Sequence, residues 1–174
     1  MHKEKVKVVI WGFGAMGSGM ARMILKKQGF QIVGVCDRNP DFRNKDLYHL
    51  LGIENPDGEE LLIKADIEDI ITPGCCDVVL LATDSYTKHS FPKITYLLKN
   101  RLNIISTAEE MSYPDAQEPE LAKELDRVAK ENGVSVLGSG VNPGMMMDLL
   151  VVFLSGIMTD VEKIKVARVN SLSP

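Results

Sequence analysis

Short apolar runs alternate along this chain with longer segments in which apolar residues recur at helical spacing. The runs are rich in β-branched residues and predict strands at Val6 to Trp11, Gln31 to Cys36, Asp77 to Ala82, Asn103 to Ser106 and Val134 to Leu137. Strands that alternate with helices are typical of a parallel sheet with helices on both faces. We therefore expect an α/β protein built on a doubly wound parallel sheet.

The periodic segments predict helices over Met16 to Ile24, Asp46 to Leu51, Ser90 to Asn100, Glu120 to Asn132 and Pro143 to Ile157. Pro92 is compatible with the third helix only in its first turn. Asn142 and Pro143 look like the cap and the first residue of the last helix. That helix is apolar on nearly every side, so we expect it to be buried. The segment Ile67 to Ile71 fits either a helix or a strand.

The last segment, Val161 to Asn170, alternates apolar and charged residues and has the character of a strand. A strand that follows the last helix of the sheet and has no partner suggests the start of a second domain. We therefore expect a first domain over residues 1–158 and the beginning of a second, truncated α/β domain over residues 159–174.

Composition excludes two classes of partner. The chain has 24 acidic and 20 basic residues, interspersed, and no basic stripe that would neutralise a nucleic acid. No apolar run reaches the roughly 18 to 20 residues needed to span a bilayer, and no signal-peptide core is evident. Cys36, Cys75 and Cys76 lack the spacing of a metal site and suit a reducing compartment. We therefore expect a cytoplasmic protein without a metal.

A glycine motif joins the first strand to the first helix. It consists of Gly12, Phe13, Gly14, Ala15, Met16 and Gly17. Gly12 allows a tight turn, Gly14 lets the backbone approach a pyrophosphate, and Gly17 lets the helix pack closely on the strand. The helix N-terminus offers N–H groups and a partial positive charge to phosphates. Such a loop in this context is the fingerprint of a Rossmann domain that binds a dinucleotide.

Asp37 completes this fingerprint, because it ends the next strand 20 residues after Gly17. Its carboxylate can accept hydrogen bonds from both hydroxyls of the adenosine ribose and would repel a 2′-phosphate, which favours NAD. Arg38 can turn toward such a phosphate and stack on the adenine, which would permit NADP, or it can be a solvated surface charge. The cofactor is thus NAD or NADP.

Other candidate cofactor contacts lie where later strands end, since an open α/β sheet binds its ligand at the carboxyl ends of its strands. If Ile67 to Ile71 is counted as a strand, Thr83 and Asp84 follow the fourth strand, Asp77 to Ala82, and Thr107 follows the fifth, Asn103 to Ser106. Asn142 lies in a glycine-dense turn after the sixth strand, Val134 to Leu137. It can contact the nicotinamide or the substrate, or simply cap a helix.

Glu109 and Glu110 are adjacent carboxylates in the loop after the fifth strand. They can bind an ammonium group or act as a general base, or they can be solvated loop acids or helix caps. Glu109 is the candidate catalytic residue, on its position alone.

Several segments together resemble the 2,4-diaminopentanoate dehydrogenases, a family similar in fold to dihydrodipicolinate reductase. They are Val8 to Gly17, Ile105 to Pro114, Gly138 to Gly144 and Arg168 to Pro174. The resemblance covers the whole chain, and the sequence Ser-Thr-Ala-Glu-Glu-Met-Ser-Tyr-Pro is more specific than the glycine motif. It implies a cofactor domain followed by a domain that supplies much of the substrate site and the oligomer contacts, which is largely missing here.

The resemblance also implies an activity: NAD(P)-dependent oxidative deamination of 2,4-diaminopentanoate, a small diamino acid, to 2-amino-4-oxopentanoate and ammonia during ornithine breakdown. A homo-oligomer is implied as well. Dihydrodipicolinate reductase itself ranks second, because it carries a glycine-threonine rich loop where this chain has Thr107 to Glu110, and no histidine follows His89. A non-catalytic dinucleotide-binding module is the alternative of another class.

Overall fold

The computed structural model describes residues 5–55 and 58–169, and these contain a five-stranded parallel sheet. Its strands are β1 (Val6–Trp11), β2 (Phe30–Cys36), β3 (Val78–Leu81), β4 (Asn103–Ser106) and β5 (Val136–Gly138). Their order in the sheet is β2-β1-β3-β4-β5, and every pair is parallel. The chain therefore leaves β1 toward one edge and later crosses to the other side, which confirms the doubly wound sheet.

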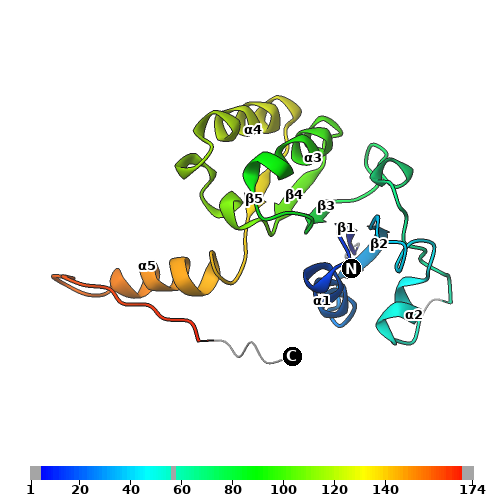
Figure 1. Ribbon diagram of the computed structural model, residues 1–174, viewed down its shortest axis with the longest axis horizontal. Helices are drawn as coiled ribbons and strands as arrows, with labels where there is room; N and C mark the ends of the chain where they lie inside the picture. Colours follow the sequence, from blue (N-terminus) through cyan, green and yellow to red (C-terminus); the bar gives the residue numbers. More distant parts are fainter. Residues whose placement is uncertain (1–4, 56–57, 170–174) are drawn as a thin grey trace.

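Helices cover both faces of this sheet (Figure 1). They are α1 (Ala15–Leu25), α2 (Leu47–Leu51), α3 (Thr87–Lys99) and α4 (Pro119–Asn132). Figure 1 shows α3 and α4 together on one side of the sheet, and α1 on the other. Short 3-10 turns η1 (Ile67–Asp69), η2 (Glu109–Ser112) and η3 (Pro114–Ala116) lie in the connections.

The alternation of side chains along each strand produces two separate cores. Val8 and Ile10 of β1 pack with Ala21 of α1 and Leu47 of α2. On the opposite face, β1 contributes Val9 to the larger core, which joins the sheet to α3 and α4. Its other members include Val79, Leu81, Ile94, Leu97, Ile104, Leu125 and Val128. Near-complete burial on both faces explains the continuous apolar strands.

Two expectations about the middle of the chain need correction. The segment Ile67 to Ile71 does not form a strand but contains η1, so β3 is the third strand and not the fourth. Helix α3 begins at Thr87 rather than Ser90, which places Pro92 in its second turn. The earlier start is stabilised from outside the helix, since the Thr87 N–H donates a hydrogen bond to Glu110 Oε2 at 2.9 Å.

The last helical segment differs most from expectation. It consists of a π turn, η4 (Met145–Leu149), followed by α5 (Leu150–Ser155). Asn142 does not cap it: Gly144 directly precedes the turn, and the Gly144 N–H donates to Asp148 Oδ2 at 2.7 Å. The segment is also not buried, because Val152 is 68% and Phe153 70% exposed.

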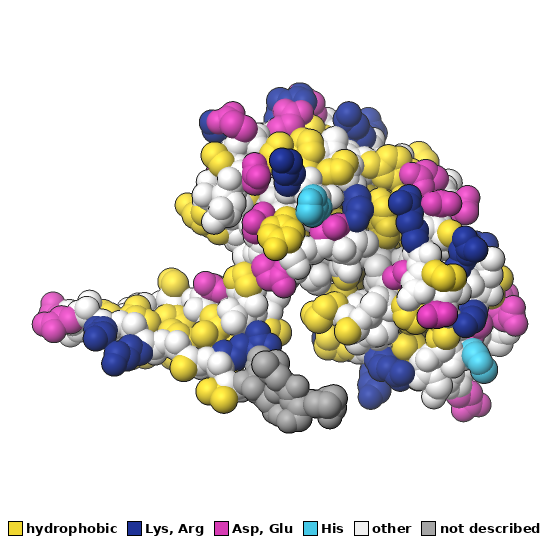
Figure 2. Space-filling view, in the orientation of Figure 1, with side chains coloured by type: hydrophobic (Ala, Val, Ile, Leu, Met, Phe, Trp, Pro, Cys, Tyr) yellow, Lys and Arg dark blue, Asp and Glu magenta, His cyan; other side chains and the backbone are white. Residues whose placement is uncertain are grey.

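Residues 161–169 follow α5 and form no strand, and Asn170 to Pro174 lie outside the described residues. A strand needs a neighbour to satisfy its backbone N–H and C=O groups, and here none is present among the described residues. In Figure 1, α5 and this segment project from the body as an arm. Apolar side chains are spread along it in Figure 2. The alternating pattern of this segment predicts a strand, but residues 161–169 form none, because the pattern does not specify which surface would cover its apolar side chains.

No helix in the described part of the chain is both long enough and apolar enough to cross a membrane.

Candidate functional site

The loop between β1 and α1 has a shape that two of its glycines make possible. Gly12 has φ +100°, and a Cβ on it would lie 2.5 Å from the carbonyl oxygen of Ala82. A Cβ on Gly17 would lie 1.8 Å from the carbonyl oxygen of Gly12. These two glycines are therefore required by the fold itself, for the tight turn and the close packing that the sequence predicted.

Gly14 differs from both, because a Cβ placed there would meet nothing within 4 Å. It directly precedes α1 and is exposed. The first N–H groups of a helix have no acceptor within the helix. An open backbone position beside such N–H groups fits a phosphate group that approaches closely.

Phe13, Ala15 and Met16 take part in this loop through their backbone. The Phe13 ring is buried and packs edge-on against Phe42, with ring centroids 5.4 Å apart. Ala15 and Met16 begin α1 and are exposed. Their side chains are therefore not constrained by the loop in the way that the glycines are.

Asp37 is bonded to the glycine loop. Its Oδ2 accepts the Phe13 N–H at 2.6 Å, and its Oδ1 accepts the Asn39 N–H at 2.8 Å. A carboxylate oxygen can accept two hydrogen bonds, so each oxygen keeps one site for a ligand hydroxyl. Arg38 is exposed, with Nη2 3.5 Å from Asp66 Oδ1.

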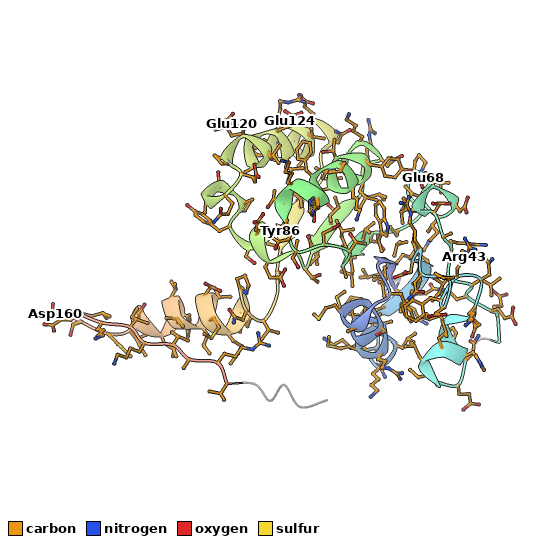
Figure 3. The ribbon with its side chains drawn as sticks, in the orientation of Figure 1. Arg43, Glu68, Tyr86, Glu120, Glu124 and Asp160 are labelled. Atoms are coloured by element: carbon orange, nitrogen blue, oxygen red, sulfur yellow. The ribbon has the colours of Figure 1, made fainter. Side chains whose placement is uncertain are left out.

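A cavity of about 600 Å³ brings Gly12, Gly14, Asp37 and Arg38 together. It lies at the carboxyl ends of β1 and β3, where the order of strands reverses and α/β sheets bind their ligands. We call it the first cavity. Its lining consists of Trp11, Gly12, Gly14, Cys36, Asp37, Arg38, Glu68, Ala82, Thr83, Pro92, Lys93 and Tyr96. Glu68 is labelled in Figure 3, on the turn η1.

Burial raises the pKa of the Cys36 thiol to about 12, with a further contribution from the charge of Asp37. The thiol therefore stays protonated near neutral pH and is a poor nucleophile. In the first cavity Cys36 is therefore an uncharged lining residue.

Lys93, which lines the first cavity from α3, was not among the residues predicted from the sequence. Its Nζ donates to Thr83 Oγ1 at 2.8 Å and to Asp84 Oδ2 at 2.5 Å, and lies 5.8 Å from the centroid of the Trp11 ring. Burial of Asp84 favours its neutral form, but hydrogen bonds from Lys93 and Thr83 outweigh this and lower the pKa of the carboxyl group. Asp84 is therefore ionised and paired near neutral pH.

A second cavity, of about 870 Å³, lies between η2, β5 and the start of the arm. Glu109 and Glu110 both line it, together with Tyr113 and Asp148. The two glutamates have different surroundings: Glu110 is half-buried and holds the first turn of α3, whereas Glu109 is exposed. The capping role that sequence left open thus applies to Glu110, and Glu109 is the one facing solvent.

Seven of the twelve expected cofactor contacts line neither of these cavities: Phe13, Ala15, Met16 and Gly17 of the glycine loop, and Asp84, Thr107 and Asn142. Thr107 is half-buried, with its hydroxyl 3.4 Å from the Leu81 carbonyl oxygen, and Asn142 is exposed. The residues that sequence missed around the first cavity are Trp11, Glu68, Pro92, Lys93 and Tyr96. The only feature of the sequence that could have pointed to these residues is their place on elements that end at or pass the carboxyl edge of the sheet.

Curated relatives match almost the entire chain. It is 55% identical over 171 residues to 2,4-diaminopentanoate dehydrogenase from Acetoanaerobium sticklandii, covering 98% of this chain and 48% of that protein. It is 27% identical to an amine dehydrogenase from Streptomyces virginiae, over 97% of this chain and 47% of that protein. The chain thus spans about half the length of the curated relatives it matches.

Solved structures agree with this. An amine dehydrogenase from Mycobacterium smegmatis superposes with a TM-score of 0.78 at 30% identity, over 90% of this chain and 45% of that one. Homoserine dehydrogenase from S. aureus, at 16% identity and a TM-score of 0.57 over 79% of this chain and 33% of that one, shares the fold. The resemblance expected from sequence is confirmed.

The family model described as dihydrodipicolinate reductase, N-terminus, matches residues 6–132, which include β1 to α4 with the glycine loop and Asp37. This domain is the one that binds NAD(P). The chain belongs to the family of dihydrodipicolinate reductase N-terminal domains.

Proposed function

We propose that this chain is the cofactor-binding part of an NAD(P)-dependent dehydrogenase that oxidatively deaminates 2,4-diaminopentanoate to 2-amino-4-oxopentanoate and ammonia, in ornithine breakdown. One observation carries the proposal: the first cavity joins the open Gly14 position to Asp37 at the point where the strand order reverses. The 55% identity to a 2,4-diaminopentanoate dehydrogenase supports the choice of substrate.

Within the first cavity, Gly14 and the N-terminus of α1 would hold the pyrophosphate. Asp37 would accept the ribose hydroxyls with the lone pairs that Phe13 and Asn39 leave, and Arg38 would cover the adenine or meet a 2′-phosphate. Thr83, Asp84, Thr107 and Asn142 would lie toward the nicotinamide. The fit rests on Gly14, where space for a side chain is left empty by the fold.

The nicotinamide, when bound, supplies the acceptor for the hydride that leaves carbon 4 of the substrate. The chain's own residues would orient the reacting groups, and the second cavity supports a place for the substrate beside the same edge of the sheet. Glu109 would contact the substrate ammonium, because its carboxylate is the exposed member of the pair. A base must take a proton from that ammonium so that the hydride can leave, and water then hydrolyses the resulting imine and releases ammonia.

We also propose that the chain divides into a cofactor domain over residues 1–158 and the beginning of a substrate and oligomerisation domain over residues 159–174. The apolar arm supports this division, since its exposed side chains are of the kind that domain and subunit contacts cover. A homo-oligomer in the cytoplasm is part of the proposal, and the free state of Cys36, Cys75 and Cys76 supports a reducing compartment.

Amine-dependent reduction of NAD and NADP by a full-length version tests this function. We expect turnover with 2,4-diaminopentanoate and little or none from the 174-residue chain alone, which provides only part of the charged surroundings a diamino acid needs. Reduction of dihydrodipicolinate in place of amine oxidation would favour the second candidate, which the family match supports. Cofactor binding without either activity would indicate a non-catalytic module.

A further inference from the structure

Three side chains at the first cavity form a closed set of hydrogen bonds. Lys93 donates to Thr83 Oγ1 and to Asp84 Oδ2, and the Thr83 hydroxyl donates to Asp84 Oδ2 at 2.7 Å. Thr83 and Asp84 follow β3, whereas Lys93 lies in α3. The set therefore joins the loop at the end of β3 to the helix that follows it.

The charges around the first cavity give this set a second consequence. Two acids, Asp37 and Glu68, and two cations, Arg38 and Lys93, line the cavity among the described residues. The Arg38 guanidinium faces Asp66 across a solvent-exposed 3.5 Å pair. The Asp84 carboxylate is hydrogen-bonded to two side chains that line the cavity, Thr83 and Lys93. The Asp84 side chain is only 20% exposed. Lys93 is the partner that offsets this charge.

Loss of that partner would leave a poorly solvated anion beside a cavity that must receive a pyrophosphate, itself an anion. Like charges in surroundings of low dielectric repel more strongly than in water. The Thr83 hydroxyl would also lose the donor that fixes its orientation, because it accepts from Lys93 while donating to Asp84.

We propose that Lys93 is a positioning residue for the dinucleotide: it neutralises Asp84 and holds the Thr83 hydroxyl, so that the negatively charged cofactor can occupy the first cavity. The inference rests on the proposed cofactor binding and assigns a role to a residue outside the glycine fingerprint. Lys93 acts through Asp84, and its effect depends on that carboxylate being charged.

A set of four proteins tests this dependence by calorimetric titration of the chain with NAD and NADP: wild type, Lys93→Met, Asp84→Asn and the double variant. We expect Lys93→Met to weaken binding by about five- to tenfold, the range for leaving a partly buried charge without its partner. Asp84→Asn alone should tighten binding, since the Lys93 ammonium then faces the phosphates unpaired. The double variant should regain most of the affinity that Lys93→Met loses.

Salt gives an independent readout that a purely structural brace would not produce. The defect of Lys93→Met should shrink between about 0.05 M and about 1 M salt, because mobile ions screen the repulsion from Asp84. Lys88→Met, which removes an exposed lysine from the same helix, is the matched control and should not show this salt-dependent defect. Unfolding midpoints of all variants show whether each is folded at the titration temperature.

The outcomes separate the inference from the function on which it rests. Failure of the wild-type chain to bind either dinucleotide overturns both. Tight wild-type binding with equal binding by Lys93→Met overturns the inference alone. A double variant as weak as Lys93→Met, at every salt concentration, also overturns it, and shows that Lys93 contacts the cofactor directly or merely braces the loop.

Discussion

Gly14 is the residue of the glycine loop at which a side chain would meet the ligand rather than the protein. Because nothing lies within 4 Å of a Cβ at this position, Gly14→Val should fold normally, with a free energy of unfolding changed by less than about 1 kcal/mol. Its side chain would occupy the place of the pyrophosphate, so we expect binding of NAD(P) to be abolished. Calorimetric titration together with urea unfolding measures both effects.

Gly19 provides the control for this substitution, since it lies in α1, is exposed and also has open space at its Cβ. Gly19→Val should bind the cofactor as the wild type does. Equal affinity of the Gly14→Val variant and the wild type would show that the pyrophosphate does not lie at this loop.

Asp37 determines, in our proposal, which dinucleotide is preferred. Asp37→Ala removes the ribose contact and the repulsion of a 2′-phosphate, so the ratio of affinities should shift toward NADP by about 1 to 3 kcal/mol. It also removes the acceptor for the Phe13 and Asn39 N–H groups, so both affinities should fall. Paired titrations with NAD and NADP measure the ratio, and an unchanged ratio would place Asp37 away from the ribose.

The chemistry-bearing residues of the glycine loop and Asp37 were predictable because their spacing along the chain determines their positions in a strand, a turn and a helix. Lys93 was not, because α3 carries several lysines and only the tertiary fold selects the one beside Asp84. Glu110 shows the same limit: its bond to the Thr87 N–H spans 23 positions in the chain.

At the level of elements, α3 is held to the preceding loop by the ion pair between Lys93 and Asp84, which are only 30% and 20% exposed. The folded state lowers the pKa of Asp84 below its ordinary value of 3.8. The stabilisation is therefore complete above that value and is lost as the pH falls through the lower, folded value. We expect about 1 kcal/mol from this pair at neutral pH.

Urea unfolding of the wild type and of Asp84→Asn, at about pH 7 and about pH 3, measures this contribution. The difference between the two proteins should narrow as the pH falls. A difference that is constant across this range would mean that the charge of Asp84 does not stabilise α3.

The elements themselves were largely predictable, because a continuous apolar run such as Val78–Leu81 suits a strand that is buried on both faces of a sheet. Errors arose where a contact distant in sequence intervened, as at the start of α3, or where the covering surface lies outside the described residues. The helix expected from Pro143 illustrates the second case: its apolar sequence predicts burial but does not identify the surface against which it would be buried.

On the scale of the whole molecule, the arm and the turn η4 before it leave an apolar stripe exposed. Leu149, Val152, Phe153 and Ile157 recur at helical spacing, and each is at least 61% exposed. An exposed apolar surface of this kind promotes association. We expect the 174-residue chain to self-associate, and Phe153→Ser to weaken the association by about 1 to 3 kcal/mol.

Sedimentation velocity over a series of concentrations measures this equilibrium. Met23→Ser is a matched control, because Met23 is 54% exposed on α1, away from the arm. A chain that stays monomeric throughout, or that is weakened equally by the two substitutions, would contradict the prediction.

Trp11 gives the cofactor site an optical reporter of its own. It is the sole tryptophan among the 174 residues, is half-buried, and lines the first cavity beside the Lys93 ammonium. Reduced nicotinamide absorbs where indole emits, so binding of NADH or NADPH should quench the fluorescence of Trp11 and excite the nicotinamide by energy transfer. Titrated emission spectra measure this, and unchanged emission at saturation would place the dinucleotide elsewhere. Every photon of indole emission from this chain therefore originates at the edge of the sheet where we place the cofactor.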